Sequence, residues 1–306
     1  MKEMKGSLVS VIMPAYNCEK FVQQAIDSVL NQSYSNFELL VADDCSKDKT
    51  KEIIDSYSDP RIKRFHNETN LGYLKASNKL FHECKGEFIT FQDADDYSSL
   101  TRIERMLEFF RINAETDALG SNVVKVNESG ELKSQTDFPL VHEEIVRNFE
   151  KYKIVFTGSA LMIRKKLISE HGIYNEYFDR IGSEDIYWFS RIIQRSRVAN
   201  LSEALYFYRF NSNSVTLNHK NPKAFVGHDL ILLLYKRRKK GKEDYIETKR
   251  WEAADVCCEF LSLIKGLNEK RKPVKDFCSL LMQHPLTGSQ FIRAFISGMR
   301  HCKQLA

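Results

Sequence analysis

Over the first 115 residues, short strand-like stretches alternate with segments whose apolar residues have helical spacing. Four short apolar stretches, each rich in β-branched or aromatic residues and each closed by a polar cluster, cover residues 8–13, 37–42, 61–66 and 87–92. Helical spacing of apolar side chains follows each stretch, over 19–32, through Ile53 to Tyr57, up to Cys84, and over 101–113. A strand alternating with a helix four times predicts an α/β fold whose parallel sheet is covered by helices on both faces.

The alternation breaks between residue 115 and about residue 220, where strands become more frequent. The pattern predicts a hairpin over 118–135 with its turn at "NESG", a buried strand leading into a short helix over 154–167, a helix over 181–196, and short strands at 197–201 and 205–210. Strand, helix and hairpin together indicate a mixed sheet rather than a purely parallel one.

From about residue 220 the spacing of apolar residues is helical to the end. We therefore expect an α/β domain over residues 1–220 and a helical region over 221–306. In this region "DLILLLY" (229–235) precedes the basic run "KRRKKGK" (236–242). Two interpretations stay open, a solvated helix end or a basic amphipathic stretch that lies on anionic membranes.

Composition narrows the class of protein. The chain has 306 residues, 42% hydrophobic and 28% charged, which is ordinary for a globular protein, and its formal charge of +5 is too low for a dedicated DNA binder. Seven scattered cysteines without zinc spacing indicate reduced thiols in the cytosol. Only about six apolar residues precede Pro14, too few for a signal peptide, and no window approaches a membrane span. We expect a cytoplasmic protein, soluble or attached peripherally to the inner face of the membrane.

Carboxylates gather where two of the predicted strands end. Asp93, Asp95 and Asp96 close the fourth stretch in "DADD", and Asp43 and Asp44 close the second. In parallel sheets ligands bind at the carboxyl ends of strands, so these clusters, together with "PAYN" (14–17) and "NETN" (67–70), are expected in one crevice. Five carboxylates there would repel one another and any phosphate unless a divalent cation intervened. An Asp-rich helix cap is the alternative interpretation.

For several other candidate residues the local pattern allows both a structural and a functional role. In "GSED" (182–185), Ser183 can cap a helix with acidic residues in its first turn, or Glu184 or Asp185 can act as a general base. His219 is a candidate metal ligand or a solvated loop residue, and Tyr16 suits either the core or a stacking platform. Trp188 is expected in the core. No Gly-x-Gly-x-x-Gly or Walker sequence is present, so a bound nucleotide would depend on carboxylates and a metal.

Three segments carry a resemblance to a known family. "VSVIMPAYNCEKFVQQAIDSVLNQSYSNFELLVADDCSKDKT", "NLGYLKASNKLFHECKGEFITFQDADD" and "GSEDIYWFSRI" resemble family 2 inverting glycosyltransferases of the GT-A fold, of the bacterial polysaccharide type, over roughly residues 7–215. The resemblance implies a nucleotide-diphospho-sugar donor, expected to be a UDP-sugar, and a divalent metal, Mn or Mg. It also implies transfer to a hydroxyl of a glycan or lipid-linked acceptor in cell-envelope polysaccharide synthesis.

The resemblance also assigns residues by position. A nucleotide-sugar half over about 1–115 and an acceptor half over about 116–220 are implied. Pro14, Ala15, Tyr16 and Asp44 match the family's nucleoside contacts. The polar clusters at the strand ends add Asn17, Asp43, Asn70 and Asp93 as candidate donor-binding residues, beside Asp95. Asp44 is placed to accept a hydrogen bond from a uracil ring N–H, and Asp95 matches the ribose or diphosphate contact. Asp95 or Asp96 matches the metal ligand, with His219 as a further candidate. Asp185 matches the catalytic base, beside Glu184.

The sequence departs from the family pattern at two places. Cys45 and Lys49 stand where Gly is frequent, and Ser77 and Lys79 replace a common Arg and Gly in the third helix. Two other classes of protein compete with a glycosyltransferase. A sugar-1-phosphate nucleotidyltransferase would want a Gly-rich, basic first loop, and a non-catalytic nucleotide- or glycan-binding module would not need two acidic clusters.

Overall fold

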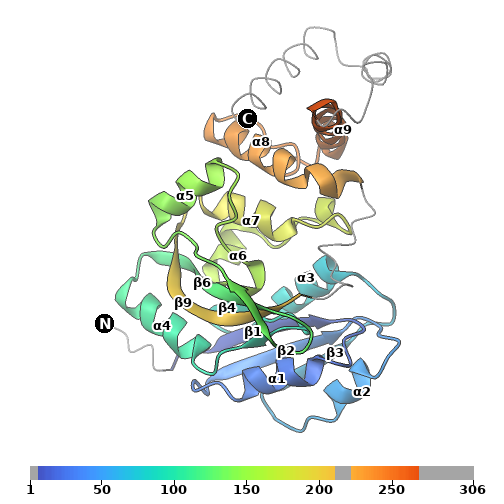
Figure 1. The fold of residues 1–306 in the computed structure, drawn as a ribbon, viewed down its shortest axis with the longest axis vertical. Coiled ribbons are helices and arrows are strands. Elements are labelled where there is room, and N and C mark those ends of the chain that lie inside the picture. The colour runs from blue at the N-terminus through green and yellow to red at the C-terminus, as the bar shows by residue number, and fades with distance from the viewer. Residues whose placement is uncertain (1–5, 211–221, 269–306) are drawn as a thin grey trace. The chain divides into compact units, whose positions relative to one another are not determined.

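The computed structural model describes residues 6–210 and 222–268 (Figure 1). In chain order the elements are β1 (Val9–Ala15), α1 (Val22–Leu30), β2 (Phe37–Asp43), α2 (Thr50–Asp55), β3 (Ile62–His66), α3 (Tyr73–Glu83), β4 (Phe88–Phe91), β5 (Tyr97–Ser98), α4 (Arg102–Ile112), β6 (Thr116–Val126), β7 (Leu132–Gln135), α5 (His142–Glu150), η2 (Gly158–Ala160), β8 (Met162–Arg164), α6 (Lys166–His171), η3 (Glu176–Phe178), α7 (Glu184–Ile192), β9 (Arg197–Arg209), η4 (Pro222–Val226), α8 (Gly227–Lys239) and α9 (Trp251–Asn268). The chain divides into two compact units, the first from Met1–Arg180 and Glu184–Leu217, the second from Ile181–Ser183 and Asn218–Ala306.

The first unit is built on one mixed sheet. Its strand order is β3-β2-β1-β4-β8-β6-β9-β5, and β7 pairs with β6. The first four strands run parallel, with Val9 opposite both Phe37 on β2 and Phe88 on β4. All residues of β2 and β4 are buried, because a sheet covered on both faces has no solvent side. The prediction of four parallel strands is confirmed, and β8 adds the antiparallel pairing that makes the sheet mixed.

Helices lie on both faces of this sheet (Figure 1). On one face α1, α2 and α4 share a core with β1, in which Met13 packs among Ile26, Ile54 and Met106. On the other face α3 and α7 meet β4. The Phe81 ring of α3 lies 5.6 Å from that of Phe91 and 5.9 Å from that of Trp188. Trp188 is 1% exposed, as expected of a core residue.

Two sequence predictions in the second half of this unit need correction. Residues 154–161 are not strand, because the chain turns at η2 and only Met162–Arg164 pair with neighbours. The two short strands expected at 197–201 and 205–210 are one strand, β9, which runs parallel to β6. Its pairing slips where Leu201 lies opposite Ser121 and Ala204 opposite Asn122. This bulge hides the continuity of β9 from a period-two pattern.

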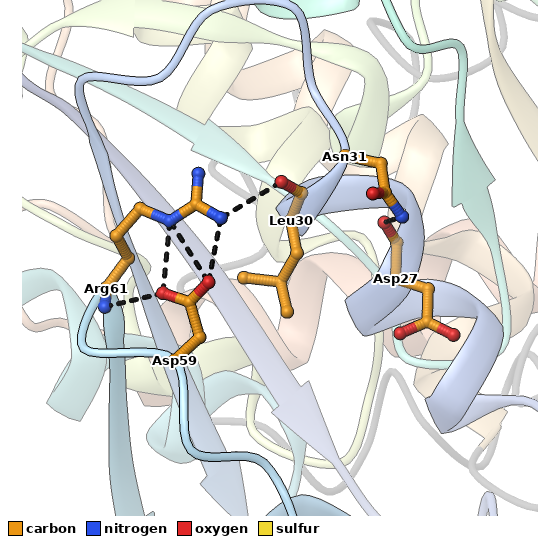
Figure 2. Close-up of polar contacts among 5 residues, drawn as sticks. All are labelled: Asp27, Leu30, Asn31, Asp59 and Arg61. Carbon is orange, nitrogen blue, oxygen red and sulfur yellow. Dashed lines mark hydrogen bonds and ion pairs between the residues drawn. The ribbon is translucent and has the colours of Figure 1, made fainter.

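Hydrogen bonds from Arg61 and Asn31 hold the C-terminal end of α1 (Figure 2). Arg61 donates to the carbonyl oxygen of Leu30 at 3.1 Å and pairs with Asp59 at 2.8 Å, while Asn31 Nδ2 donates to the Asp27 carbonyl at 2.8 Å. A cation at the C-terminal end of a helix satisfies carbonyls that lack partners within the helix. The same Arg61 orders the turn that leads into β3.

The second unit changes the interpretation of the basic run. Leu230, Ile231 and Leu234 of α8 are at most 1% exposed, so this apolar stretch is part of the protein interior. Arg238 pairs with Asp244, and Arg237 Nε donates to the carbonyl oxygen of Glu243 at 2.9 Å. These buried leucines and isoleucine do not face a membrane, whereas Lys239, Lys240 and Lys242 are exposed, so membrane contact through the basic run stays a prediction. Over the ranges 6–210 and 222–268, none of the helices is long and apolar enough to span a bilayer.

Candidate active site

Hydrogen bonds join the loops after β1 and β2 at the carboxyl edge of the sheet. Asn17, in a left-handed conformation with φ 49°, donates its N–H to Ser46 Oγ at 3.0 Å. Its side-chain oxygen accepts from the N–H of Lys47 at 2.8 Å. Tyr16 beside it is 48% exposed, which removes the core interpretation and leaves the ring available as a platform. Pro14 and Ala15 are the last two residues of β1.

Asp44 organises the loop before α3. Its carboxylate accepts from Asn67 Nδ2 at 2.8 Å, from the N–H of Leu71 at 2.9 Å and from the N–H of Gly72 at 2.8 Å. Asn70 Nδ2 donates to the Asp44 carbonyl at 3.3 Å. Asp44 is 2% exposed, so its carboxylate supports the loop; the predicted contact with a uracil N–H stays a prediction. Asp43, equally buried, accepts from the N–H of Ser46 at 3.3 Å.

The three carboxylates of "DADD" occupy different environments. Asp93 accepts from the Tyr73 hydroxyl at 3.2 Å, and burial together with the charge of Asp95 raises the pKa of Asp93 to about 7. Asp96 is 2% exposed, and its Oδ1 accepts from the N–H of Arg209 at 2.6 Å. Burial and then the charge of Asp95 raise the pKa of Asp96 well above its usual range. Asp95 is half-buried, so it is more accessible than Asp96.

Two buried arginines hold this acidic loop in place, and sequence reasoning missed both. Arg209 Nε donates to the Asp95 carbonyl at 2.9 Å, and its Nη1 reaches the Glu128 carbonyl at 2.6 Å. Arg102 donates to the Phe91 carbonyl at 3.0 Å and to the Ser159 carbonyl at 2.7 Å, and burial lowers its pKa to about 10. The sequence pattern could have predicted the burial of Arg102, because Arg102 lies four residues before Met106 and therefore on the apolar face of α4.

The acidic pair of α7 lies within electrostatic reach of Asp93. Burial, followed by the charges of Asp185 and Asp93, raises the pKa of Glu184 to about 8. Burial also raises the pKa of Asp185, whose Oδ1 accepts from the N–H of Ile186 at 2.7 Å. Ser183 has φ 71°, whereas an N-cap residue has β-region angles, so the geometry disfavours the simple capping interpretation. The structure therefore brings together carboxylates that are far apart in the sequence.

Gly158 leaves the space that Asp185 occupies. A Cβ atom at position 158 would lie 2.5 Å from Asp185 Oδ2, closer than real contacts allow, and 3.2 Å from the Asp185 Cβ, which is a tight contact. We expect Gly158→Ala to displace the carboxylate and lower kcat by roughly 10- to 100-fold, if Asp185 acts on the substrate. Gly6→Ala is the matched control, because nothing lies within 4 Å of its added methyl group. An unchanged kcat in Gly158→Ala would show that the rate does not depend on the position of the Asp185 carboxylate.

The acidic loop fits a divalent cation only in part. No group of three His, Cys, Asp or Glu side chains arranged for a metal occurs among the residues that the structure describes, and His219 lies outside them. Mg²⁺ at phosphates is commonly held by one or two carboxylates, with phosphate oxygens and water as the other ligands. Asp95, with Asp93 beside it, suits such a set. Asp96 suits it less, because its Oδ1 accepts from the N–H of Arg209 and its side chain is 2% exposed.

Comparison with known proteins finds glycosyltransferases. The family model described as "Glycosyl transferase family 2" matches residues 10–172. An uncharacterised glycosyltransferase of Haemophilus influenzae is 32% identical over 226 residues, covering 70% of this chain and 69% of the relative. The Escherichia coli enzyme WfgD, a UDP-Glc:alpha-D-GlcNAc-diphosphoundecaprenol beta-1,3-glucosyltransferase, is 28% identical over 218 residues, covering 70% of this chain and 82% of WfgD.

Solved structures share the fold. S. aureus TarS 1–349 matches with a TM-score of 0.60 and 23% identity, covering 75% of this chain, which spans 65% of TarS 1–349 in that comparison. The TarS complex with UDP-GlcNAc matches with a TM-score of 0.64 and 21% identity, covering 95% of this chain and 79% of TarS 1–349. The mixed sheet is therefore that of the GT-A fold, as the sequence predicted.

Proposed function

Because this chain belongs to glycosyl transferase family 2, and is thus a glycosyltransferase, we propose that it moves a sugar from a UDP-sugar to a hydroxyl of a glycan or lipid-linked acceptor, with inversion. The observation that carries the proposal is the meeting of Asp93, at the carboxyl end of β4, with Glu184 and Asp185 at the start of α7. Donor-binding and base functions need to lie side by side for an in-line displacement.

The proposed chemistry uses these carboxylates in separate roles. The acceptor oxygen attacks the anomeric carbon from the face opposite the nucleoside diphosphate, while the bond from that carbon to the diphosphate oxygen breaks through an oxocarbenium-like transition state. Asp185 takes the hydroxyl proton, and Glu184 orients the acceptor. Asp95 and Asp93 would hold a divalent cation, which when bound supplies Lewis-acid stabilisation of the leaving diphosphate.

Several observations support a uridine nucleotide. Tyr16 is 48% exposed at the carboxyl end of β1, where an aromatic ring can stack on a base. WfgD is named for a UDP-glucose donor, and TarS binds UDP-GlcNAc. The lipid-diphosphate GlcNAc acceptor in the name of WfgD supports a lipid-linked acceptor for this chain.

A donor screen tests the proposed function. Purified protein with MnCl₂ is incubated with UDP-, GDP- and dTDP-sugars, with and without a GlcNAc-diphospholipid acceptor, and free nucleoside diphosphate is measured. We expect release from a UDP-sugar, increased by the acceptor, with a β-linked product from an α-linked donor. Release from none of these donors would contradict the proposal. Pyrophosphate formed from a nucleoside triphosphate and a sugar 1-phosphate would instead identify a nucleotidyltransferase.

Peripheral membrane contact is a separate part of the proposal. Lys239, Lys240 and Lys242 are exposed at the end of α8 and can contact anionic headgroups, at about 1 kcal/mol for each lysine. We expect the protein to sediment with anionic vesicles and not with phosphatidylcholine vesicles. Replacing these three lysines by Gln should abolish the sedimentation. Equal recovery of both proteins in the supernatant with anionic vesicles would show that this basic run is only a solvated helix end.

A further inference from the structure

The crevice that would receive the donor is strongly acidic. Asp93 lies within electrostatic reach of Asp95 and Asp185, and Glu184 and Asp185 form the acidic first turn of α7. A nucleoside diphosphate brings more negative charge into the same place. Binding it therefore requires positive charge from the protein in addition to any bound cation.

The lysines nearest the loop before α3 are already engaged. Lys79 Nζ donates to Asn67 Oδ1 at 2.8 Å, and Lys75 pairs with Asp179 at 2.7 Å. Ser77, which stands where the family commonly has an arginine, is 1% exposed and cannot reach the crevice. Helix α3 therefore presents neither an arginine nor an unengaged lysine to an anionic ligand.

Arg180 differs from these two lysines in its hydrogen-bond geometry. It is exposed, and both of its hydrogen bonds use Nη2, to the carbonyl of Asn70 at 2.9 Å and to Asn70 Oδ1 at 3.0 Å. Among the described residues Nη1 and Nε of Arg180 donate no hydrogen bond, so their N–H groups can bind a ligand. Each of these groups can donate to one phosphate oxygen, and the guanidinium keeps its positive charge at neutral pH.

The surroundings hold this guanidinium beside the donor loop. Gly72, with φ 85°, directly precedes α3, and a Cβ atom there would lie 3.5 Å from Arg180 Cζ. Asn70, its hydrogen-bond partner, also donates to the carbonyl of Asp44 at 3.3 Å. Tyr73, the first residue of α3, donates its hydroxyl to Asp93 at 3.2 Å. Arg180 is thus bonded to the loop before α3, which contacts Asp44 after β2 and is followed directly by the Tyr73 contact to Asp93.

We propose that Arg180 binds the diphosphate of the nucleotide-sugar donor and stabilises its charge as it leaves. The proposal rests on the proposed function, since it assigns a residue to that donor site. The segment between η3 and α7 would then contribute to donor binding as well as lead to Glu184 and Asp185. The positive charge that the family commonly has in α3 would come from this segment instead.

Titration calorimetry with UDP and with uridine, in MnCl₂, tests this assignment in the full chain. We expect Arg180→Gln to weaken UDP binding by roughly 10- to 100-fold and to leave uridine binding within about twofold, because the lost interaction is with phosphate. Arg180→Lys should bind UDP more tightly than Arg180→Gln but less tightly than the unchanged protein, since lysine keeps the positive charge and lacks the directional guanidinium N–H groups. The matched control is Arg147→Gln, an exposed arginine of α5 that pairs with Glu144 at 3.6 Å.

The outcomes separate the possible failures. Equal UDP affinity in Arg180→Gln and the unchanged protein would overturn the assignment of Arg180 while leaving the proposed function in place. An equal loss for UDP and uridine would also overturn it, because Arg180 would then only support the Asn70 loop. If the unchanged protein bound neither UDP nor another nucleoside diphosphate, the proposed function and this inference would both be wrong.

Discussion

Asp185→Asn is expected to lower kcat by roughly 100-fold or more while leaving donor affinity and melting temperature nearly unchanged. An acceptor hydroxyl has a pKa far above 7, so attack on the anomeric carbon needs a base within about 3 Å of its proton. Asp185 is proposed for that role because it is held by the N–H of Ile186 in the space left by Gly158. The measurement is steady-state transfer together with thermal unfolding of the same protein.

Glu184→Gln is the matched variant for this prediction. We expect it to raise the KM for the acceptor more than it lowers kcat, because Glu184 is proposed to orient the acceptor. If Glu184→Gln loses kcat and Asp185→Asn keeps it, the base is Glu184. If both variants keep normal kcat, the base lies elsewhere in the chain.

The pH dependence provides an independent check. Burial raises the pKa of Asp185, so this carboxylate becomes protonated at a higher pH than an ordinary aspartate. A base must be ionised to accept a proton, so kcat/KM of the unchanged protein is expected to fall as the pH is lowered through this raised pKa. The residual activity of Asp185→Asn should lack that dependence.

The second large effect is expected at the acidic loop after β4. Excess EDTA should abolish transfer, and Asp95→Asn should lower kcat by roughly 100-fold or more, a usual scale for losing charge stabilisation of a leaving group. Titration with UDP and uridine in the same variant should show weakened UDP binding only, since the cation contacts phosphate. Full activity in excess EDTA would contradict a metal-assisted reaction.

Asp96→Asn separates the two neighbouring carboxylates. Asp96 is buried against the backbone N–H of Arg209, so its replacement is expected to act through the conformation of the loop and to lower the melting temperature as well as activity. Asp95→Asn should leave the melting temperature nearly unchanged. A reversal of these two results would make Asp96 the direct ligand.

The sequence by itself determined the first half of the fold and the edge of the sheet at which the polar loops after β1, β2 and β4 lie. Strand and helix periodicities are local properties, and they placed β1 to β4 and their helices within a few residues. The rule that parallel strands present their carboxyl ends at one edge then brought Asn17, Asp44 and Asp93 to the same side of the sheet. The resemblance to family 2 glycosyltransferases rested on these same segments and is confirmed by the family match over residues 10–172.

Only the tertiary structure decided which side chains face the crevice. Asp44 and Asp96 have the same residue type as Asp95, yet both are 2% exposed, because hydrogen-bond partners from distant elements turn their carboxylates inward. The roles proposed for Gly158 and Arg180 likewise depend on contacts with Asp185 and Asn70 that no local pattern encodes. Burial of the apolar run of α8 follows the same logic, since periodicity shows that a face is apolar and only packing shows what covers it.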